Sequence, residues 1–384
     1  MRFEFASAGR IVFGPGSVRE IAPAARKMGR CVLLVTGGSP ARAAGIAREL
    51  EAAGVSCTGF RVASEPTVEL IRQGTARAHE ERCDTLIAVG GGSVIDAGKA
   101  IAALLANGGD PLDYLEVIGA GRPLLRASAP FIAVPTTAGT GSEVTRNAVL
   151  ASLEHRVKAS LRSAGMLPRL AVVDPELTLD LPPALTASTG LDALTQLIEP
   201  FVSVRANPMT DAICLEGMQR ACGALARAYR NGKDSEARTD MSLASLFGGI
   251  ALANAGLGAV HGFAAPVGGM FDAPHGAVCA ALLPHAMRVN IRALRARAPE
   301  SEALRRYETV ARVLTGDAAA SPEDGVASLE RLCQELSVSP LRTYGIGDRD
   351  VPELVQKAAK ASSMKGNPIT LSGDELTELL VRAL

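Results

Sequence analysis

The alternation of short apolar runs with helical patterns over the first 180 or so residues restricts the fold of this chain most strongly. The apolar runs are CVLLVT (31–36), TLIAVG (85–90), FIAVPT (131–136) and LAVVD (170–174), and segments with helical periodicity lie among them. This rhythm predicts parallel strands joined by crossover helices. Several runs end directly in Gly or Thr turns, and open parallel sheets bind ligands at the carboxyl ends of their strands. We therefore expect a nucleotide site at these turns.

The pattern changes at Pro182-Pro183. From there the strand-like runs disappear and long Ala- and Leu-rich helical patterns follow, such as 208–230 and 300–314, with a predicted loop from Thr315 to Asp324. Because 384 residues exceed the size at which one core usually keeps growing, we predict two domains. These are an α/β domain over residues 1–180 and a helical domain over residues 181–384, and the default place for an active site is a cleft between them.

Composition argues against several kinds of partner. Forty basic residues balance forty acidic ones, and no basic run is interleaved with aromatics, so nothing favours nucleic acid or an anionic membrane. The first residues lack a basic segment followed by a sustained apolar run, and we expect a cytoplasmic protein. The seven cysteines are scattered and never form a CxxC pair, which argues against a disulfide framework or a thiolate zinc site and predicts reduced packing residues. The expected ligand is a small molecule.

Two polar turns follow predicted strands. In TLIAVGGGSVIDAGKA (85–100) an apolar run meets three glycines and a serine before a helical pattern begins. Glycines let the backbone approach a pyrophosphate, and a helix N-terminus offers unpaired N–H groups, so this turn is typical of an anion site. Ser93 and Asp96 also have capping-box spacing, and capping is the alternative for both. The turn matches neither GxGxxG nor the P-loop, which weakens an ordinary Rossmann interpretation.

The second turn, PTTAGTGSEVT (135–145), offers threonines, a serine and glycines that suit phosphate, ribose or a nicotinamide amide. Alone it is equally well a plain loop. Paired with the glycine turn in one sheet, it favours a dinucleotide.

Histidine is concentrated in residues 250–289, an Ala-, Gly- and Pro-rich apolar stretch that holds three of the five histidines of the chain. Upstream, GLDALTQLIEP (190–200) places Asp192 and Gln196 one helical turn apart, on the same face. Asp192, His261 and His275 could together hold a divalent ion, with Gln196 as a fourth ligand. The alternatives are a helix-surface carboxylate and hydrogen-bonded core histidines.

Four motifs, GGGSVIDAGKA, PTTAGTGSEVT, GLDALTQLIEP and HGFAAPVGGMFDAPHG, in this order and spacing, resemble the iron-containing (group III) alcohol dehydrogenase family through about residue 290. The resemblance implies a dehydroquinate synthase-like architecture: an N-terminal dinucleotide-binding domain, a helical domain for metal and substrate, and a metal between them. It implies an NAD- or NADP-dependent oxidoreductase that interconverts a small alcohol and its aldehyde or ketone by hydride transfer at Fe²⁺ or Zn²⁺. It also implies a homodimer or higher homo-oligomer, with a strand from Arg2 to Ala6 pairing across the dimer axis.

The resemblance carries over to individual residues. The implied cofactor-binding residues are Gly37, Gly91, Gly92, Ser93, Asp96, Thr136, Thr137, Thr140 and Lys158. Among them the glycine turn would hold the pyrophosphate with Asp96 supporting it, the threonines would line the cofactor path, and Lys158 would reach the ribose or nicotinamide. Without the resemblance, Lys158 is better interpreted as a solvated surface lysine. Asp192, His261 and His275 fall on three metal-ligand positions of the family and are the implied catalytic residues.

Three positions depart from the family pattern. Gln196 stands where the family usually has a second ligand, a histidine; an amide oxygen is a poorer ligand than imidazole for Fe²⁺ or Zn²⁺, so we expect weaker metal binding. Ala265 replaces a common histidine thought of as a proton relay. Gly37 replaces an aspartate that accepts the adenosine ribose hydroxyl, which makes NADPH plausible and Arg42 a candidate partner for its 2′-phosphate.

Three other functions remain open. A metal-independent enzyme resembling the maleylacetate reductases would need cationic clamps for an oxo-diacid, and Arg146 is the nearest candidate. A lyase resembling the dehydroquinate synthases would need a dense cationic phosphate pocket that the sequence lacks. A non-catalytic nucleotide-binding protein would have lost its metal site through Gln196 and Ala265.

Overall fold

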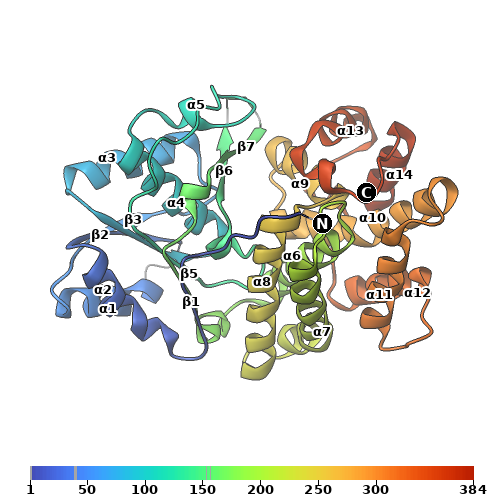
Figure 1. The fold of residues 1–384 in the computed structure, drawn as a ribbon, viewed down its shortest axis with the longest axis horizontal. Helices are drawn as coiled ribbons and strands as arrows, with labels where there is room; N and C mark the ends of the chain where they lie inside the picture. Colours follow the sequence, from blue (N-terminus) through green and yellow to red (C-terminus); the bar gives the residue numbers. More distant parts are fainter. Residues whose placement is uncertain (1, 39–40, 153, 156) are drawn as a thin grey trace. The chain divides into compact units, whose positions relative to one another are not determined.

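The chain folds into two compact units in the computed structural model, which describes residues 2–38, 41–152, 154–155 and 157–384 (Figure 1). The first, the sheet unit, comprises Ala6–Thr137 and Gly141–Thr178. The second, the helical unit, comprises the N-terminal residues through Phe5, the short segment Ala138–Thr140, and Leu179–Leu384.

A six-stranded parallel sheet forms the centre of the sheet unit, in the order β1-β8-β5-β4-β2-β3. The strands are β1 (Ile11–Phe13), β2 (Cys31–Thr36), β3 (Ser56–Arg61), β4 (Thr85–Gly90), β5 (Phe131–Pro135) and β8 (Leu170–Val173). All residues of β4, β5 and β8 are buried, as expected for parallel strands covered on both faces. The four predicted apolar runs therefore form β2, β4, β5 and β8.

Helices cover both faces of the sheet (Figure 1). They are α1 (Ile21–Met28), α2 (Ala41–Ala52), α3 (Val68–Glu80), α4 (Gly92–Asn107) and the short α5 (Pro111–Tyr114). Because alternate strand residues point to opposite faces, Leu33 and Leu86 pack in one hydrophobic cluster with residues of α3 and α4. Val32 and Ile87 pack in another cluster with residues of α1 and α2. This three-layer α/β arrangement confirms the predicted fold class.

The sequence analysis missed four strands. The strands β1 and β3 lie at the two edges of the sheet, where less burial leaves a weaker apolar pattern. The other two, β6 (Asn147–Ser152) and β7 (Val157–Arg162), form an antiparallel pair outside the main sheet. No strand is assigned over residues 2–10, so the predicted strand from Arg2 to Ala6 does not form within one copy of the chain.

The first long helix of the helical unit begins at Pro183, close to the predicted change of pattern. Residues 174–384 contain no strand. Its helices are α6 (Pro183–Val202), α7 (Pro208–Arg230), α8 (Ser235–Ala255), α9 (Ala259–Met270), α10 (His275–Arg297), α11 (Glu302–Thr315), α12 (Pro322–Glu335), α13 (Val351–Lys360) and α14 (Gly373–Ala383). Polar caps define several starts: Asn207 accepts from Thr210 N at α7, and Ser321 accepts from Asp324 N at α12. The predicted loop from Thr315 to Asp324 overlaps the connection between α11 and α12.

Within the described parts of the chain, no single helix is both long and apolar enough to cross a bilayer. The pair α8 and α9 would meet that length and composition only together, and the two helices are bent by 99° relative to each other.

Candidate functional site

The glycine turn after β4 leads into α4 without a side-chain cap. Gly91 is the N-cap residue, and its carbonyl accepts the first helical hydrogen bonds, from Val94 N at 3.0 Å and Ile95 N at 3.1 Å. The N–H groups of Gly92 and Ser93 therefore precede the hydrogen-bonded part of the helix, where an anion is stabilised. Ser93 lies inside the first turn, so the capping-box alternative for Ser93 and Asp96 is wrong.

The threonine turn lies beside the glycine turn. Thr136 N donates to Gly90 O at 2.9 Å, and a Cβ placed on Gly91 would lie 3.4 Å from the Thr137 side chain. Gly37 follows the neighbouring strand β2, and a Cβ there would lie 3.4 Å from Val94 of α4. The carboxyl ends of β2, β4 and β5 thus bring three predicted nucleotide-binding turns together.

The order of the strands makes this edge of the sheet a favoured ligand site. Along the chain, β3 lies on one side of β2, whereas β4, β5 and β8 follow on the other side. The direction of winding therefore reverses between β2 and β4, and nucleotides bind in such sheets at the carboxyl ends of the strands where this happens.

Asp96 and Lys99 tie α4 to the segment after the threonine turn. Asp96 accepts from Ser142 Oγ at 2.5 Å and from Val149 N at 2.9 Å, and it pairs with Lys99 Nζ at 3.0 Å. Lys99 is completely buried and also donates to Ser142 O, Thr145 Oγ1 and Asn147 O. Burial lowers the pKa of Lys99, with Asp96 opposing the shift, and burial raises the pKa of the adjacent Glu143 to about 7. This network holds the two turns in one geometry.

Three other residues predicted to bind the cofactor do not lie at the ends of β2, β4 and β5 in the described part of the sheet unit. Lys158, on β7, pairs with Glu65 at 3.3 Å, and only 9% of its side chain is exposed, so it is not a solvated surface lysine. Thr140 belongs to the helical unit rather than to the sheet unit that carries the glycine turn. The side chain of Arg42 lies outside the described residues.

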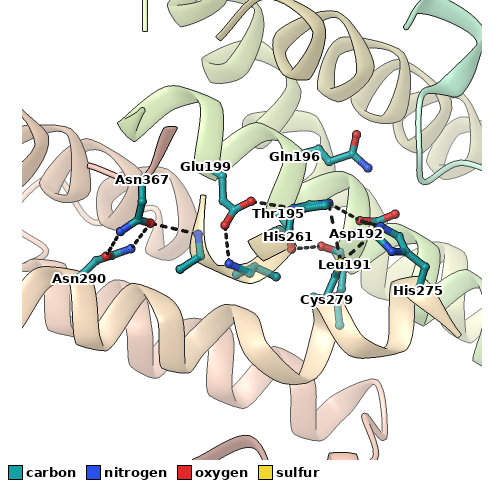
Figure 2. A network of polar contacts seen from close by, with 12 residues as sticks. Leu191, Asp192, Thr195, Gln196, Glu199, His261, His275, Cys279, Asn290 and Asn367 are labelled. Atoms are coloured by element: carbon teal, nitrogen blue, oxygen red, sulfur yellow. Dashed lines mark hydrogen bonds and ion pairs between the residues drawn. The ribbon is translucent and has the colours of Figure 1, made fainter. Parts of the chain in front are cut away.

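Four side chains converge in the helical unit: Asp192 from α6, His261 from α9, and His275 and Cys279 from α10 (Figure 2). Asp192 Oδ1 lies 3.3 Å from His261 Nε2 and 3.7 Å from His275 Nε2. Cys279 Sγ lies 3.8 Å and 3.7 Å from the same two nitrogens. Only 1% of the Asp192 side chain and 6% of the His261 side chain are exposed, against 34% for His275. The predicted aspartate and histidines therefore form one buried group.

Glu199 orients the His261 ring. Its Oε2 lies 2.7 Å from His261 Nδ1, and its Oε1 accepts from Val260 N at 2.7 Å (Figure 2). A carboxylate that faces Nδ1 places the ring hydrogen there, which leaves the Nε2 lone pair directed at Asp192. When His261 is neutral, its ring and ionised Asp192 face each other with lone pairs only, and either a proton on Nε2 or a metal ion between them stabilises this arrangement.

A second polar network positions the start of α9. Asn367 Oδ1 accepts from Ala259 N at 3.1 Å and from Asn290 Nδ2 at 3.1 Å, while Asn367 Nδ2 donates to Asn290 Oδ1 at 2.7 Å (Figure 2). Asn290 also donates to Tyr307 at 3.1 Å. Because His261 lies two residues after Ala259, this amide pair supports the position of the histidine.

Gln196 occupies the same face of α6 as Asp192. Its Nε2 donates to Gly139 O at 3.4 Å, and its buried Oε1 has no hydrogen-bond donor, nor does Asp192 Oδ1. Buried oxygens without donors are rare in folded proteins. Together with two imidazole nitrogens, Asp192 Oδ1 belongs to a donor set that fits a divalent cation.

The charges of the group reinforce one another. Burial alone would raise the pKa of Asp192, but His275 and His261 outweigh it and lower that pKa to about 2. Burial opposes protonation of both histidines, yet the neighbouring Cys279 and Asp192 raise the pKa of His275 to about 9 and hold that of His261 well above its usual value. The group therefore favours positive charge at its centre, as a proton or as a metal ion.

Cys279 and Glu199 were missed by the sequence analysis, although a helical spacing could have revealed both. Cys279 lies four residues after His275, and Glu199 lies seven residues after Asp192. Both spacings put the pair on one helix face.

Comparison with known proteins supports one family over nearly the whole chain. A family model described as iron-containing alcohol dehydrogenase matches residues 8–175, and a second, described as the C-terminal part of the Fe-containing alcohol dehydrogenase family, matches residues 186–384. The chain is 38% identical to alcohol dehydrogenase 4 of Schizosaccharomyces pombe over 84% of this chain and 74% of that protein. It is 33% identical to the NAD-dependent methanol dehydrogenase of Bacillus methanolicus over 97% of each.

The fold agrees with this similarity. A crystal structure of a 1,3-propanediol oxidoreductase superposes with a TM-score of 0.92 and 32% sequence identity, covering 100% of both chains. The predicted resemblance is therefore confirmed: this chain belongs to the iron-containing alcohol dehydrogenase family and is an oxidoreductase that interconverts alcohols and carbonyl compounds.

Proposed function

We propose that the enzyme oxidises a small alcohol, or reduces the corresponding aldehyde or ketone, with a nicotinamide dinucleotide at the sheet unit and a divalent metal at Asp192, His261 and His275. The observation that carries the metal assignment is the 3.3 Å approach of Asp192 Oδ1 to His261 Nε2, while Glu199 faces the other ring nitrogen. Two lone pairs held this close in a buried place call for a cation between them.

The nucleotide would bind where β2, β4 and β5 end. Gly91, Gly92 and Ser93 would hold the pyrophosphate with the N–H groups of the α4 N-terminus, and Thr136 and Thr137 would contact the next part of the cofactor. The hydrogen bonds of Asp96 to Ser142 and Val149 support this geometry, because they prevent the two turns from separating. When bound, the nicotinamide accepts or delivers the hydride.

The metal, when bound, would polarise the substrate oxygen and stabilise negative charge on it. The residues of this chain would hold the metal and shield it from water. Asp192 supplies charge, Glu199 keeps the Nε2 lone pair of His261 available, and the apolar core around α6, α9 and α10 limits access of water. Ala265 cannot carry a proton, so exchange of the hydroxyl proton with solvent would use water on the more exposed His275 side.

We propose that NADP is accepted as well as NAD. The strand β2 ends in Thr36 and Gly37 without a carboxylate, so a 2′-phosphate would meet no negative charge there. At the end of the adjacent β3, Arg61 Nη2 donates to Gly38 O at 3.2 Å, which supports a cation beside the expected adenosine ribose. We expect Arg61→Ala to lower kcat/KM with NADPH more than with NADH.

The compartment and assembly remain proposals too. All seven cysteines are free, which supports a reducing compartment such as the cytoplasm. A homodimer stays a prediction from the family.

The proposed function is tested with chelator-stripped enzyme, assayed for NADH and NADPH oxidation against short aldehydes, with and without added Fe²⁺ or Zn²⁺ under anaerobic conditions. We expect activity to return with metal in the wild type and to stay absent in Asp192→Ala. Unchanged turnover in Asp192→Ala, or full activity of stripped enzyme, would refute the metal role.

A further inference from the structure

We propose that Cys279 is a metal ligand of this enzyme and takes the coordination place that Gln196 leaves open. The inference rests on the proposed function, because it names the ligands of the same metal. It makes the donor set one carboxylate oxygen, two imidazole nitrogens and one thiolate sulfur.

The four donor atoms lie close enough together to share one metal ion. All lie within 4.8 Å of one another, and four of their separations run from 3.3 to 3.8 Å. Bonds of about 2.0 Å to nitrogen and oxygen and about 2.3 Å to sulfur place tetrahedral ligands about 3.3–3.5 Å apart. The four separations that join Asp192 and Cys279 to the two histidine nitrogens differ from these values by only a few tenths of an ångström.

Helix α10 explains why the thiol reaches the group. His275 and Cys279 are four residues apart on that helix, so their side chains share a face. Sγ is close to the Nε2 atoms of both histidines, and these are the nitrogens that face Asp192. The thiol is therefore part of the convergent group rather than of the surrounding core.

Gln196 is less well placed to ligate the ion. Its Nε2 donates to the carbonyl of Gly139 at 3.4 Å, and the side chain is also a hydrogen-bond partner of Asp192. Both interactions use the nitrogen end of the amide. Gln196 is thus a positioning residue for Asp192.

A thiolate changes which metal the site prefers. With Asp192 ionised and Cys279 deprotonated, two negative charges face a divalent ion, and sulfur favours borderline metals such as Zn²⁺ and Co²⁺ over harder ions. We expect Zn²⁺ to bind more tightly than Fe²⁺. The cluster also explains how a chain with glutamine at position 196 retains four protein ligands.

The test uses Co²⁺ as the probe on full-length, chelator-stripped enzyme. One equivalent of Co²⁺ should produce an intense thiolate-to-cobalt charge-transfer band in the near ultraviolet. The band should vanish in Cys279→Ser and persist in the matched control Cys222→Ser and in Gln196→Ala. Zn²⁺ affinity should fall at least about 100-fold in Cys279→Ser, since loss of an outer-shell partner alone costs about 10–100-fold.

A measurement without any variant protects the test against misfolding. X-ray absorption of the Zn²⁺-loaded wild type should show one sulfur neighbour at about 2.3 Å beside nitrogen and oxygen neighbours. Bound Co²⁺ without a charge-transfer band, or bound Zn²⁺ without a sulfur neighbour, would overturn the ligand role of Cys279 while leaving the metal-dependent function standing. Failure of the wild type to bind either ion would overturn both.

Discussion

Replacing Glu199 by glutamine should weaken metal binding although residue 199 is not expected to touch the metal. The amide can keep the hydrogen bond from Val260 N through its oxygen, but its nitrogen then faces His261 Nδ1 in place of the carboxylate oxygen now at 2.7 Å. Two N–H donors would oppose each other, so the imidazole hydrogen must move to Nε2. That tautomer has no lone pair for the ion.

The magnitude follows from comparable carboxylate–histidine pairs. Loss of such an outer partner lowers metal affinity about 10–100-fold. This corresponds to about 1.4–2.7 kcal/mol of binding free energy. Because only 8% of the Glu199 side chain is exposed, solvent screening should not reduce the effect much.

The assay is a Zn²⁺ titration of stripped protein in competition with a chromophoric chelator at fixed pH. Glu216→Gln is the matched control, because Glu216 is exposed on α7 and pairs with Arg220 at 2.6 Å, away from the histidines. Circular dichroism would verify that both variants are folded. A folded Glu199→Gln protein whose Zn²⁺ dissociation constant stayed within about threefold of the wild type would refute the tautomer argument.

Three further predictions concern the sheet unit. Gly91→Ala should fold normally, because the φ of Gly91 is −74° and the nearest atoms to a new Cβ lie at 3.4 Å. The variant should nevertheless bind NADH about tenfold or more weakly, because the new methyl group fills the space through which the phosphate approaches the backbone. Gly90→Ala, whose Cβ would lie 2.5 Å from Val94, should instead lower the melting temperature. Asp96→Asn should lower the free energy of unfolding by about 3 kcal/mol in urea titrations, because it leaves Lys99 buried without its counter-charge, and a loss below about 1 kcal/mol would contradict this. Burial raises the pKa of Glu143 to about 7, above its unfolded value, so ionisation of Glu143 destabilises the folded state as pH rises from about 4.5 through 7. Over that window Glu143→Gln should become more stable relative to the wild type. If the difference in free energy of unfolding between the two proteins were the same at pH 5 and pH 8, this prediction would be wrong.

The central strands could be predicted because burial on both faces requires uninterrupted apolar runs. The strand β4 illustrates this, with TLIAVG buried at each residue. The edge strand β3, SCTGFR, has only one neighbour and alternates between partly buried and exposed residues, so its pattern resembles a loop. The strands β6 and β7 lie outside the main sheet and pair with each other, and partly buried residues interrupt their apolar pattern.

The metal group could be predicted in part for a similar reason. Histidines in an apolar stretch and an aspartate within a buried helix are unusual enough to be noticed, so the convergence of Asp192, His261 and His275 could be predicted, while their role as metal ligands stays a proposal. Cysteine is common in cores, and Cys279 within an Ala- and Leu-rich helix looks like a packing residue. Glu199 precedes Pro200 and resembles an ordinary helix-end carboxylate. Only the packing of α9 against α6 reveals that it faces a histidine ring.

The hydrogen bond from Ala259 N to Asn367 also has a consequence for the order in which a newly made chain matures. The sheet unit ends at Thr178, whereas the start of α9 at Ala259 is held by a residue 108 positions further along the chain. Domains emerging from the ribosome fold from the N-terminus onward. A half-synthesised chain can therefore contain the whole sheet unit long before His261 is held in place, and loading of the proposed metal becomes a late, essentially post-translational step in the life of the enzyme.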